Sequence, residues 1–159
     1  MSKDFRQLKV WQKSHQLALN LYQITASFPR TESYGLTSQI RRAGVSIPSN
    51  IAEGCGRNGD TELARFCDIA RGSASELEYQ LLLASDLKLI QPDDYEQLVQ
   101  QTTDIKRMLT VFVRKLRAES ARPLHTGLPK PWLRPAAALG RIKALFSKCL
   151  PILDSPDFR

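Results

Sequence analysis

The segment of residues 39–57 concentrates hydrogen-bonding and ionisable side chains at helical spacing. If the segment is helical, these side chains follow one edge of an apolar row that includes Ile40, Ile47 and Ile51. They are Gln39, Arg42, Ser46, Asn50, Glu53 and Arg57. Such groups are costly to bury unless each finds a partner, so the pattern predicts an internal salt-bridge network or a contact between subunits. The alternative is a solvated edge, where ion pairs contribute little to stability.

A second group of side chains is suited to binding phosphate. Arginine makes bidentate contacts with phosphate, and the candidates are Arg41, Arg65 and Arg71. Arg42 and Arg57 are also basic, but internal pairing with Glu53 or Glu76 is favoured for them. Lysines with few acidic neighbours are more available to a polyanion, and these are Lys9, Lys13, Lys143 and Lys148. Such contacts would hold a nucleic acid without reading its sequence.

The sequence offers little for catalysis. It has two histidines, His15 and His125, and it contains neither paired-cysteine metal spacing nor a His-Glu-x-x-His motif. The glycine-rich stretch of residues 54–59 lacks the lysine and the serine or threonine of a phosphate-binding loop. A Cys55 nucleophile with His15 as its base is the one catalytic alternative that the sequence leaves open. We therefore expect no catalytic residue, no metal and no cofactor.

Composition and charge indicate a domain with a real core and a basic C-terminal segment. The chain has 159 residues, of which 42% are hydrophobic and 25% are charged. The formal charge of +7 is uneven, because residues 1–117 hold 16 Lys/Arg against 13 Asp/Glu and residues 118–159 hold seven against three. This basic balance favours acidic partners such as nucleic acid.

The expected location is a reducing cytoplasm. The three cysteines, Cys55, Cys67 and Cys149, form no close pair, and no apolar signal peptide follows the N-terminal methionine. No run of the sequence reaches the length of about 18 uninterrupted apolar residues that a membrane span requires. An integral membrane protein is therefore not expected.

Apolar side chains recur at spacings of three and four through most of the first 117 residues, which predicts four helices. We expect them at residues 5–28, at about 32–54, from a cap at Asn58 or Asp60 to about 90, and from Pro92 to about 117. An apolar heptad runs through the last helix from Tyr95 to Leu116 and specifies a helical neighbour. Short links between long helices predict an all-α, antiparallel up-down four-helix bundle.

The first two helices carry features that a single bundle does not require. Pro48 lies inside the second helix and predicts either a kink near residues 44–47 or two abutting helical pieces. The first helix is apolar over a wide arc, because Trp11 and Tyr22 extend its core row. An excess apolar face needs a partner, which a second copy of the chain would supply. The alternative is that the C-terminal segment covers this face within the same chain.

Beyond residue 117 the composition changes. Six of the nine prolines lie at Pro123 or later, so residues 118–135 are interpreted as a Pro-rich linker. Residues 136–159 form a basic tail, in which residues 136–150 have the spacing of a short amphipathic helix. We expect residues 1–117 to form the bundle domain and the tail to add nothing to its core.

Five stretches of the expected bundle resemble a known family. They are Leu8-Lys-Val-Trp-Gln-Lys, Phe28-Pro, Tyr34-Gly-Leu-Thr-Ser-Gln-Ile-Arg-Arg-Ala, Ser46-Ile-Pro-Ser-Asn-Ile-Ala-Glu-Gly and Ala70-Arg-Gly-Ser-Ala-Ser-Glu-Leu-Glu. In their order and spacing they resemble the 23S ribosomal RNA intervening-sequence protein family over about residues 5–117. The accessory variability proteins of diversity-generating retroelements are more distantly similar. The resemblance implies a bacterial four-helix protomer that assembles into a ring-like homopentamer and has no catalytic activity.

The resemblance also implies partners, namely RNA, DNA or a nucleic-acid enzyme such as a reverse transcriptase. The resulting hypothesis is a non-enzymatic, oligomeric nucleic-acid-binding or nucleoprotein accessory protein. In it the polar edge of residues 39–57, together with Glu76, holds the assembly together. The alternative hypothesis is a protein-interaction scaffold that binds no nucleic acid, because its basic residues are consumed in salt bridges between subunits.

Overall fold

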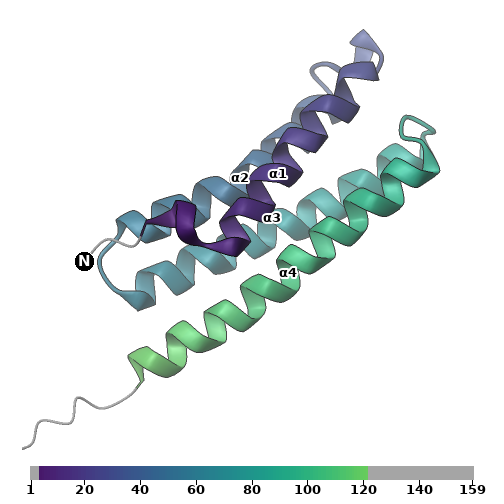
Figure 1. Ribbon diagram of the computed structural model, residues 1–159. Coiled ribbons are helices and arrows are strands. Elements are labelled where there is room, and N and C mark those ends of the chain that lie inside the picture. Colours follow the sequence, from purple (N-terminus) through teal and green to yellow (C-terminus); the bar gives the residue numbers. More distant parts are fainter. Residues whose placement is uncertain (1–3, 122–159) are drawn as a thin grey trace, which may run out of the picture. The chain divides into compact units, whose positions relative to one another are not determined.

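The computed structural model describes residues 4–121, which fold into four α-helices joined by short links (Figure 1). These are α1 (Lys9–Ile24), α2 (Leu36–Gly56), α3 (Asp60–Asp86) and α4 (Pro92–Ser120). Three 3-10 helices accompany them, η1 (Phe5–Gln7), η2 (Thr25–Ser27) and η3 (Arg30–Glu32). Successive α-helices run in opposite directions, and contacts join α1 to α2, α2 to α3, α3 to α4 and α4 back to α1. The expected all-α, up-down architecture is confirmed.

Each α-helix contributes a row of apolar side chains to one core. The largest fully buried side chains are Leu17, Leu21, Ile40, Ile47, Ile51, Leu63, Leu77, Leu81, Leu98, Ile105, Leu109 and Leu116. In α4 they follow the expected heptad, although Tyr95 and Phe112 are only partly buried. Removing this surface from water is the main force that holds the helices together. Tyr22, which the spacing placed beside the core row of the first helix, is about half exposed, at 48%.

The second helix runs unbroken through Pro48, so the expectation of two abutting pieces is wrong. Ile47 and Ile51 on either side of the proline are fully buried, which holds both halves in one packed helix. The helix starts at Leu36 because Glu32 belongs to η3 and its carboxylate accepts a hydrogen bond from the Leu36 amide, at 3.2 Å.

The expected ends of α3 are corrected at both termini. The residue before the helix is Gly59, with a φ of 89°, so the cap position falls between the expected Asn58 and Asp60. Glycine adopts this left-handed conformation without steric cost. The helix ends at Asp86 and not near residue 90, because Lys88 takes a φ of 57°. There the Leu89 amide donates to the Ala84 carbonyl, at 2.9 Å, which closes the helix end.

The first helix is shorter than expected and the last is longer. Residues 5–28 do not form one helix, because extended backbone at Leu8 separates η1 from α1 and a tighter turn, η2, follows Ile24. The fourth helix begins at Pro92 as expected and continues past residue 117 to Ser120. The expected linker beyond residue 121 and the tail of residues 136–159 lie outside the described residues. No helix in residues 4–121 is long and apolar enough to cross a membrane.

Candidate functional site

The polar edge of α2 meets α3 in a line of hydrogen bonds and ion pairs. Arg42 contacts the carboxylate of Glu76 across the two helices, with 2.5 Å between Nη2 and Oε1. The same guanidinium donates to the Gln39 side chain, at 3.1 Å. Glu76 also accepts from the buried amide of Gln80, at 3.2 Å. These contacts fix the Arg42 and Glu76 side chains at the seam between the two helices.

Further along α2, the remaining members of the polar edge are also engaged. The hydroxyls of Ser46 and Ser73 lie 2.9 Å apart across the seam, and Asn50 donates to the Ser46 carbonyl, at 2.8 Å. Glu53 and Arg57 pair within α2, with 2.5 Å between Oε1 and Nη2. The internal pairing of Arg42 and Arg57 with Glu76 and Glu53 is therefore present.

The paired side chains of this seam are largely exposed to solvent in a single protomer. The side chains of Arg42 and Glu76 are 63% and 41% exposed, and those of Arg57 and Glu53 are 55% and 49% exposed. Within one protomer the pairs thus face solvent, where an ion pair contributes little. Their burial between copies of the chain stays a prediction.

Replacing Glu53 with alanine tests that prediction. In a protomer whose Glu53–Arg57 pair is solvated, the free energy of unfolding should fall by less than about 1 kcal/mol. If the pair is buried between copies, the loss should reach about 3 kcal/mol, because Arg57 would be left unpaired away from water. Urea denaturation, with particle size measured by light scattering on the same samples, separates the two outcomes.

Most arginines named as phosphate contacts are already engaged. Arg65 pairs with Glu62 at 3.2 Å, and Arg71 pairs with Asp68 at 2.9 Å. Asp68 also accepts from an α4 arginine, Arg117. A phosphate would have to compete with these carboxylates, which weakens the case for Arg65 and Arg71 as nucleic-acid contacts.

Arg41 is held in a different way. Its Nε donates to the Thr25 hydroxyl at 2.8 Å, and its guanidinium lies 4.7 Å from the centre of the Tyr22 ring. No acidic side chain within residues 4–121 pairs with it. Arg41 therefore keeps its net charge at the α1–α2 surface, next to an exposed aromatic ring.

The two lysines of α1 are the most available cations among the named residues. Lys9 and Lys13 are exposed, and within the described part of the chain neither forms an ion pair. Lys13 borders a groove of about 220 Å³ between α1 and α4 that also includes Gln16, Gln101 and Asp104. Helix α1 contains no acidic side chain at all. Lys143 and Lys148 lie outside the described residues.

The charge of the bundle is divided between its two halves. Residues 9–56, which contain α1 and α2, hold five Lys/Arg against two Asp/Glu, whereas residues 57–121, which contain α3 and α4, hold nine against eleven. The five described cations named from the sequence are spread over α1, α2 and α3, and no contact in residues 4–121 links one to another. They do not form one patch.

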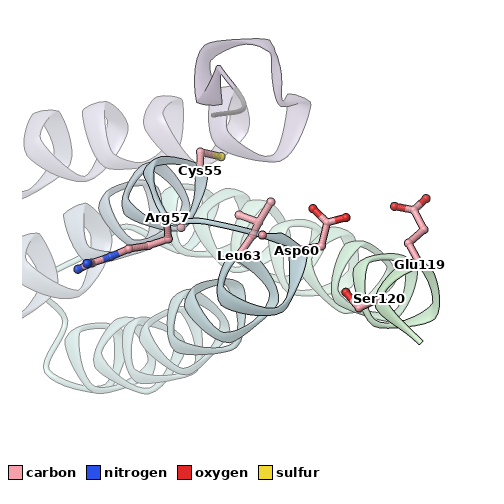
Figure 2. A pocket seen from close by; sticks show the side chains of 8 residues that line it. Cys55, Arg57, Asp60, Leu63, Glu119 and Ser120 are labelled. Atoms are coloured by element: carbon pink, nitrogen blue, oxygen red, sulfur yellow. The ribbon is translucent and has the colours of Figure 1, made fainter. Parts of the chain in front are cut away.

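A polar pocket of about 350 Å³ opens where the ends of α2, α3 and α4 meet (Figure 2). Its lining includes Cys55, Arg57, Asp60, Leu63, Glu119 and Ser120. Figure 2 shows Arg57 extending away from the side where Asp60 and Glu119 lie. Because the pocket presents carboxylates while its arginine is paired with Glu53, it is poorly suited to a phosphate.

Cys55 and His15, the possible nucleophile and its base, line two different cavities. Cys55 is 3% exposed and belongs to the polar pocket, whereas His15 belongs to a hollow between α1 and α2. There the His15 ring stacks on Trp11, with centroids 5.1 Å apart. Phe5 packs against the same indole, at 4.8 Å, in agreement with a packing role for Trp11. Within residues 4–121 no three His, Cys, Asp or Glu side chains gather closely enough to hold a metal ion.

This α1–α2 hollow, of about 440 Å³, is a feature that sequence reasoning did not locate. Its lining includes Trp11, His15, Leu19, Tyr22, Val45 and Ala52, and it contains no lysine or arginine. The wide apolar arc of α1 was the available signal, but the contribution of α2 became visible only when the register of the two helices was known.

Comparisons with known proteins agree with this architecture. Residues 6–111 match the model of the family described as 23S rRNA-intervening sequence protein. A crystal structure of a protein of unknown function from the S23 ribosomal protein family of Bacteroides thetaiotaomicron VPI-5482 superposes with a TM-score of 0.59 at 28% sequence identity. The match covers 66% of this chain and 98% of that one. No curated protein matches the sequence significantly. With its four-helix fold and a family match over most of the bundle, the chain belongs to the 23S rRNA-intervening sequence protein family.

Proposed function

We propose that this protein is a non-enzymatic, cytoplasmic accessory protein that binds RNA, DNA or a nucleic-acid enzyme such as a reverse transcriptase. The observation that carries the proposal is the state of Lys9 and Lys13, which are exposed, unpaired within residues 4–121 and carried by a helix without acidic residues. Lysines in such surroundings can neutralise phosphates and release their counterions. Binding of this kind depends on charge and is tolerant of sequence.

The proposed working form is a ring-like homopentamer. A single protomer offers few free cations, but a ring repeats each of them on every subunit, so two lysines become a band of positive charge. The apolar side chains left exposed on α1 and α2 favour an oligomer, because exposed apolar surface of this kind is usually covered by a partner.

A second candidate function is a scaffold that binds protein alone. The pairing of Arg42, Arg57, Arg65 and Arg71 with carboxylates favours it, because these arginines are not available to phosphate. In this case, affinity for nucleic acid should be undetectable at about 50 mM salt, or should not respond to salt.

Reversing the charge of both α1 lysines tests the proposed nucleic-acid binding. The Lys9→Glu/Lys13→Glu variant should bind a mixed-sequence single-stranded RNA about tenfold more weakly at about 50 mM salt, because two phosphate contacts are lost. The slope of log affinity against log salt should become shallower by roughly 1.4 for each engaged protomer. Fluorescence anisotropy over a salt series measures both quantities.

A matched control separates local contact from overall charge. Arg30 and Lys88 are exposed residues of the helix links and form no ion pair within residues 4–121. Arg30→Glu/Lys88→Glu changes the net charge by the same amount and should reduce the affinity much less. Equal losses in the two double variants would mean that net charge alone attracts the RNA and that α1 is not the contact surface.

A further inference from the structure

Six of the exposed apolar side chains of the bundle lie either in the α1–α2 hollow or on α3. Nine large hydrophobic side chains in residues 4–121 are exposed. Three of them, Leu19, Tyr22 and Val45, line the α1–α2 hollow. Three others, Ile69, Tyr79 and Leu82, lie on α3. Single exposed apolar residues are ordinary, but clusters of this kind mark interaction surfaces.

The hollow has the character of a protein-binding surface. Its rings pack against one another, because both the His15 ring and the Phe5 ring contact Trp11. No lysine or arginine lines it, so a polyanion would find no charge to contact there. Lys13 borders the separate groove between α1 and α4. The hollow and the proposed nucleic-acid contacts are therefore different surfaces of α1.

Three exposed apolar residues of α3 and an exposed glycine lie along one side of the helix. Ile69, Gly72, Tyr79 and Leu82 recur at spacings of three and seven, which places them on one face of the helix, and we refer to them as the α3 row. All four are exposed. A Cβ added at Gly72 would meet no atom within 4 Å, so packing within the protomer does not require glycine there. A glycine inside a helix costs about 1 kcal/mol relative to alanine, and it lets another backbone approach closely.

The two surfaces differ in charge. Helix α3 carries six acidic side chains against two arginines, and Glu76 and Asp86 lie beside the row. On the other side, Arg41 of α2 lies over the Tyr22 ring that lines the hollow, and no acidic side chain within residues 4–121 pairs with it. An arginine without an acidic partner beside an apolar hollow fits an acidic surface around the apolar α3 row.

We propose that the α3 row of one copy of this chain docks into the α1–α2 hollow of the next copy. This inference rests on the proposed homo-oligomer and names the surfaces that join its protomers. Because the two surfaces differ, the contact is heterologous, and its repetition closes into a ring or continues as a filament. The contact would also cover Glu76, so it would bury the Arg42–Glu76 pair of the polar seam between copies.

Mixing two variants of the full chain tests this arrangement. Leu19→Glu places a charge in the hollow, and Tyr79→Glu places one in the row; the wild-type side chains are 45% and 64% exposed, so each variant should fold. Size-exclusion chromatography with light scattering should show the wild type as an oligomer and each variant alone as a monomer. An equal mixture should give a dimer and nothing larger, because one intact hollow meets one intact row.

The control variant is Val111→Glu, which changes an apolar α4 side chain that is 67% exposed and belongs to neither surface. It should keep the wild-type size, and circular dichroism should show all three variants folded. A Tyr79→Glu variant of wild-type size, a mixture that stays monomeric or a monomeric wild type would each overturn the inference. Anisotropy with the same RNA on monomeric variants tests the Lys9 and Lys13 contacts separately, so the interface and the nucleic-acid function can fail independently.

Discussion

Replacing Gly54 with valine is expected to lower the free energy of unfolding by about 3 kcal/mol. A Cβ at this position would lie 2.9 Å from the Phe66 Cβ and 3.3 Å from the Leu63 Cα. The second contact is with backbone, so α3 itself would have to move away from α2. Valine adds two further methyl groups and a β-branch to this crowded site. Urea denaturation followed by far-ultraviolet circular dichroism measures the loss.

Gly56 is the matched control, because it lies in the last turn of the same helix and a Cβ there would meet nothing within 4 Å. Gly56→Ala should leave stability unchanged or raise it by up to about 1 kcal/mol, since alanine favours helix over glycine. The free energy of unfolding of Gly54→Ala should fall between those of Gly54→Val and Gly56→Ala. This variant still tests the contact if the valine variant does not fold. Wild-type stability in both Gly54 variants would mean that α2 and α3 do not approach each other this closely.

Apolar spacing predicted the four helices, but it predicted a helix end correctly only where a clear local signal marked that end. Pro92 begins α4 because its ring suits a first helical position and the acidic pair after it faces the positive end of the helix dipole. The end of α3 was missed because Lys88 adopts the left-handed conformation that glycine normally marks. A single backbone dihedral angle decides that end, and apolar periodicity does not encode it.

Some polar contacts could likewise be predicted from local sequence spacing, and others could not. Glu53 and Arg57 are four residues apart, so a helix alone brings them together. The Arg42–Glu76 pair depends on the register between α2 and α3, which a single sequence does not specify. The second helix is expected to end at about residue 54, but α2 continues to Gly56, so Gly54 lies inside it. Gly54 lets Phe66 and Leu63 approach α2 closely, and this role appears only in the packed bundle.

The division of charge between the two halves of the bundle links these observations. On α3, Arg65 and Arg71 pair with carboxylates of the same helix, so little positive charge is left there for a polyanion. Helix α1 has no carboxylate of its own, and Lys9 and Lys13 form no ion pair within residues 4–121. The same division makes α1–α2 and α3 electrostatically opposite, which favours contact between unlike surfaces of two copies. One asymmetry therefore supports both the nucleic-acid contacts and the assembly that we propose.

Alkaline pH is expected to destabilise the bundle through Cys67. Burial, with smaller contributions from Cys55 and Asp68, raises the pKa of this thiol from 9.0 to about 12. Below the unfolded pKa of 9.0 both states keep the proton, and the full contribution to stability is present. At higher pH the unfolded chain loses the proton while the folded chain retains it, so unfolding becomes more favourable by about 1.4 kcal/mol per pH unit.

From about pH 9 to about pH 11 this group should lower the free energy of unfolding by up to roughly 2.7 kcal/mol. Tyrosines and lysines titrate in the same range, so the measurement is the difference between the wild type and Cys67→Ala, both with Cys149→Ser to remove the thiol outside the described residues. At neutral pH the Cys67→Ala variant should be the less stable, because it leaves a small cavity at a fully buried position. As the pH rises the two stability curves should converge, since only the wild type has the Cys67 thiol to ionise, whereas the Cys55 thiol is present in both. Curves that stay parallel up to about pH 11 would show that Cys67 ionises as readily in the folded chain as in the unfolded one, and would contradict the pKa rise.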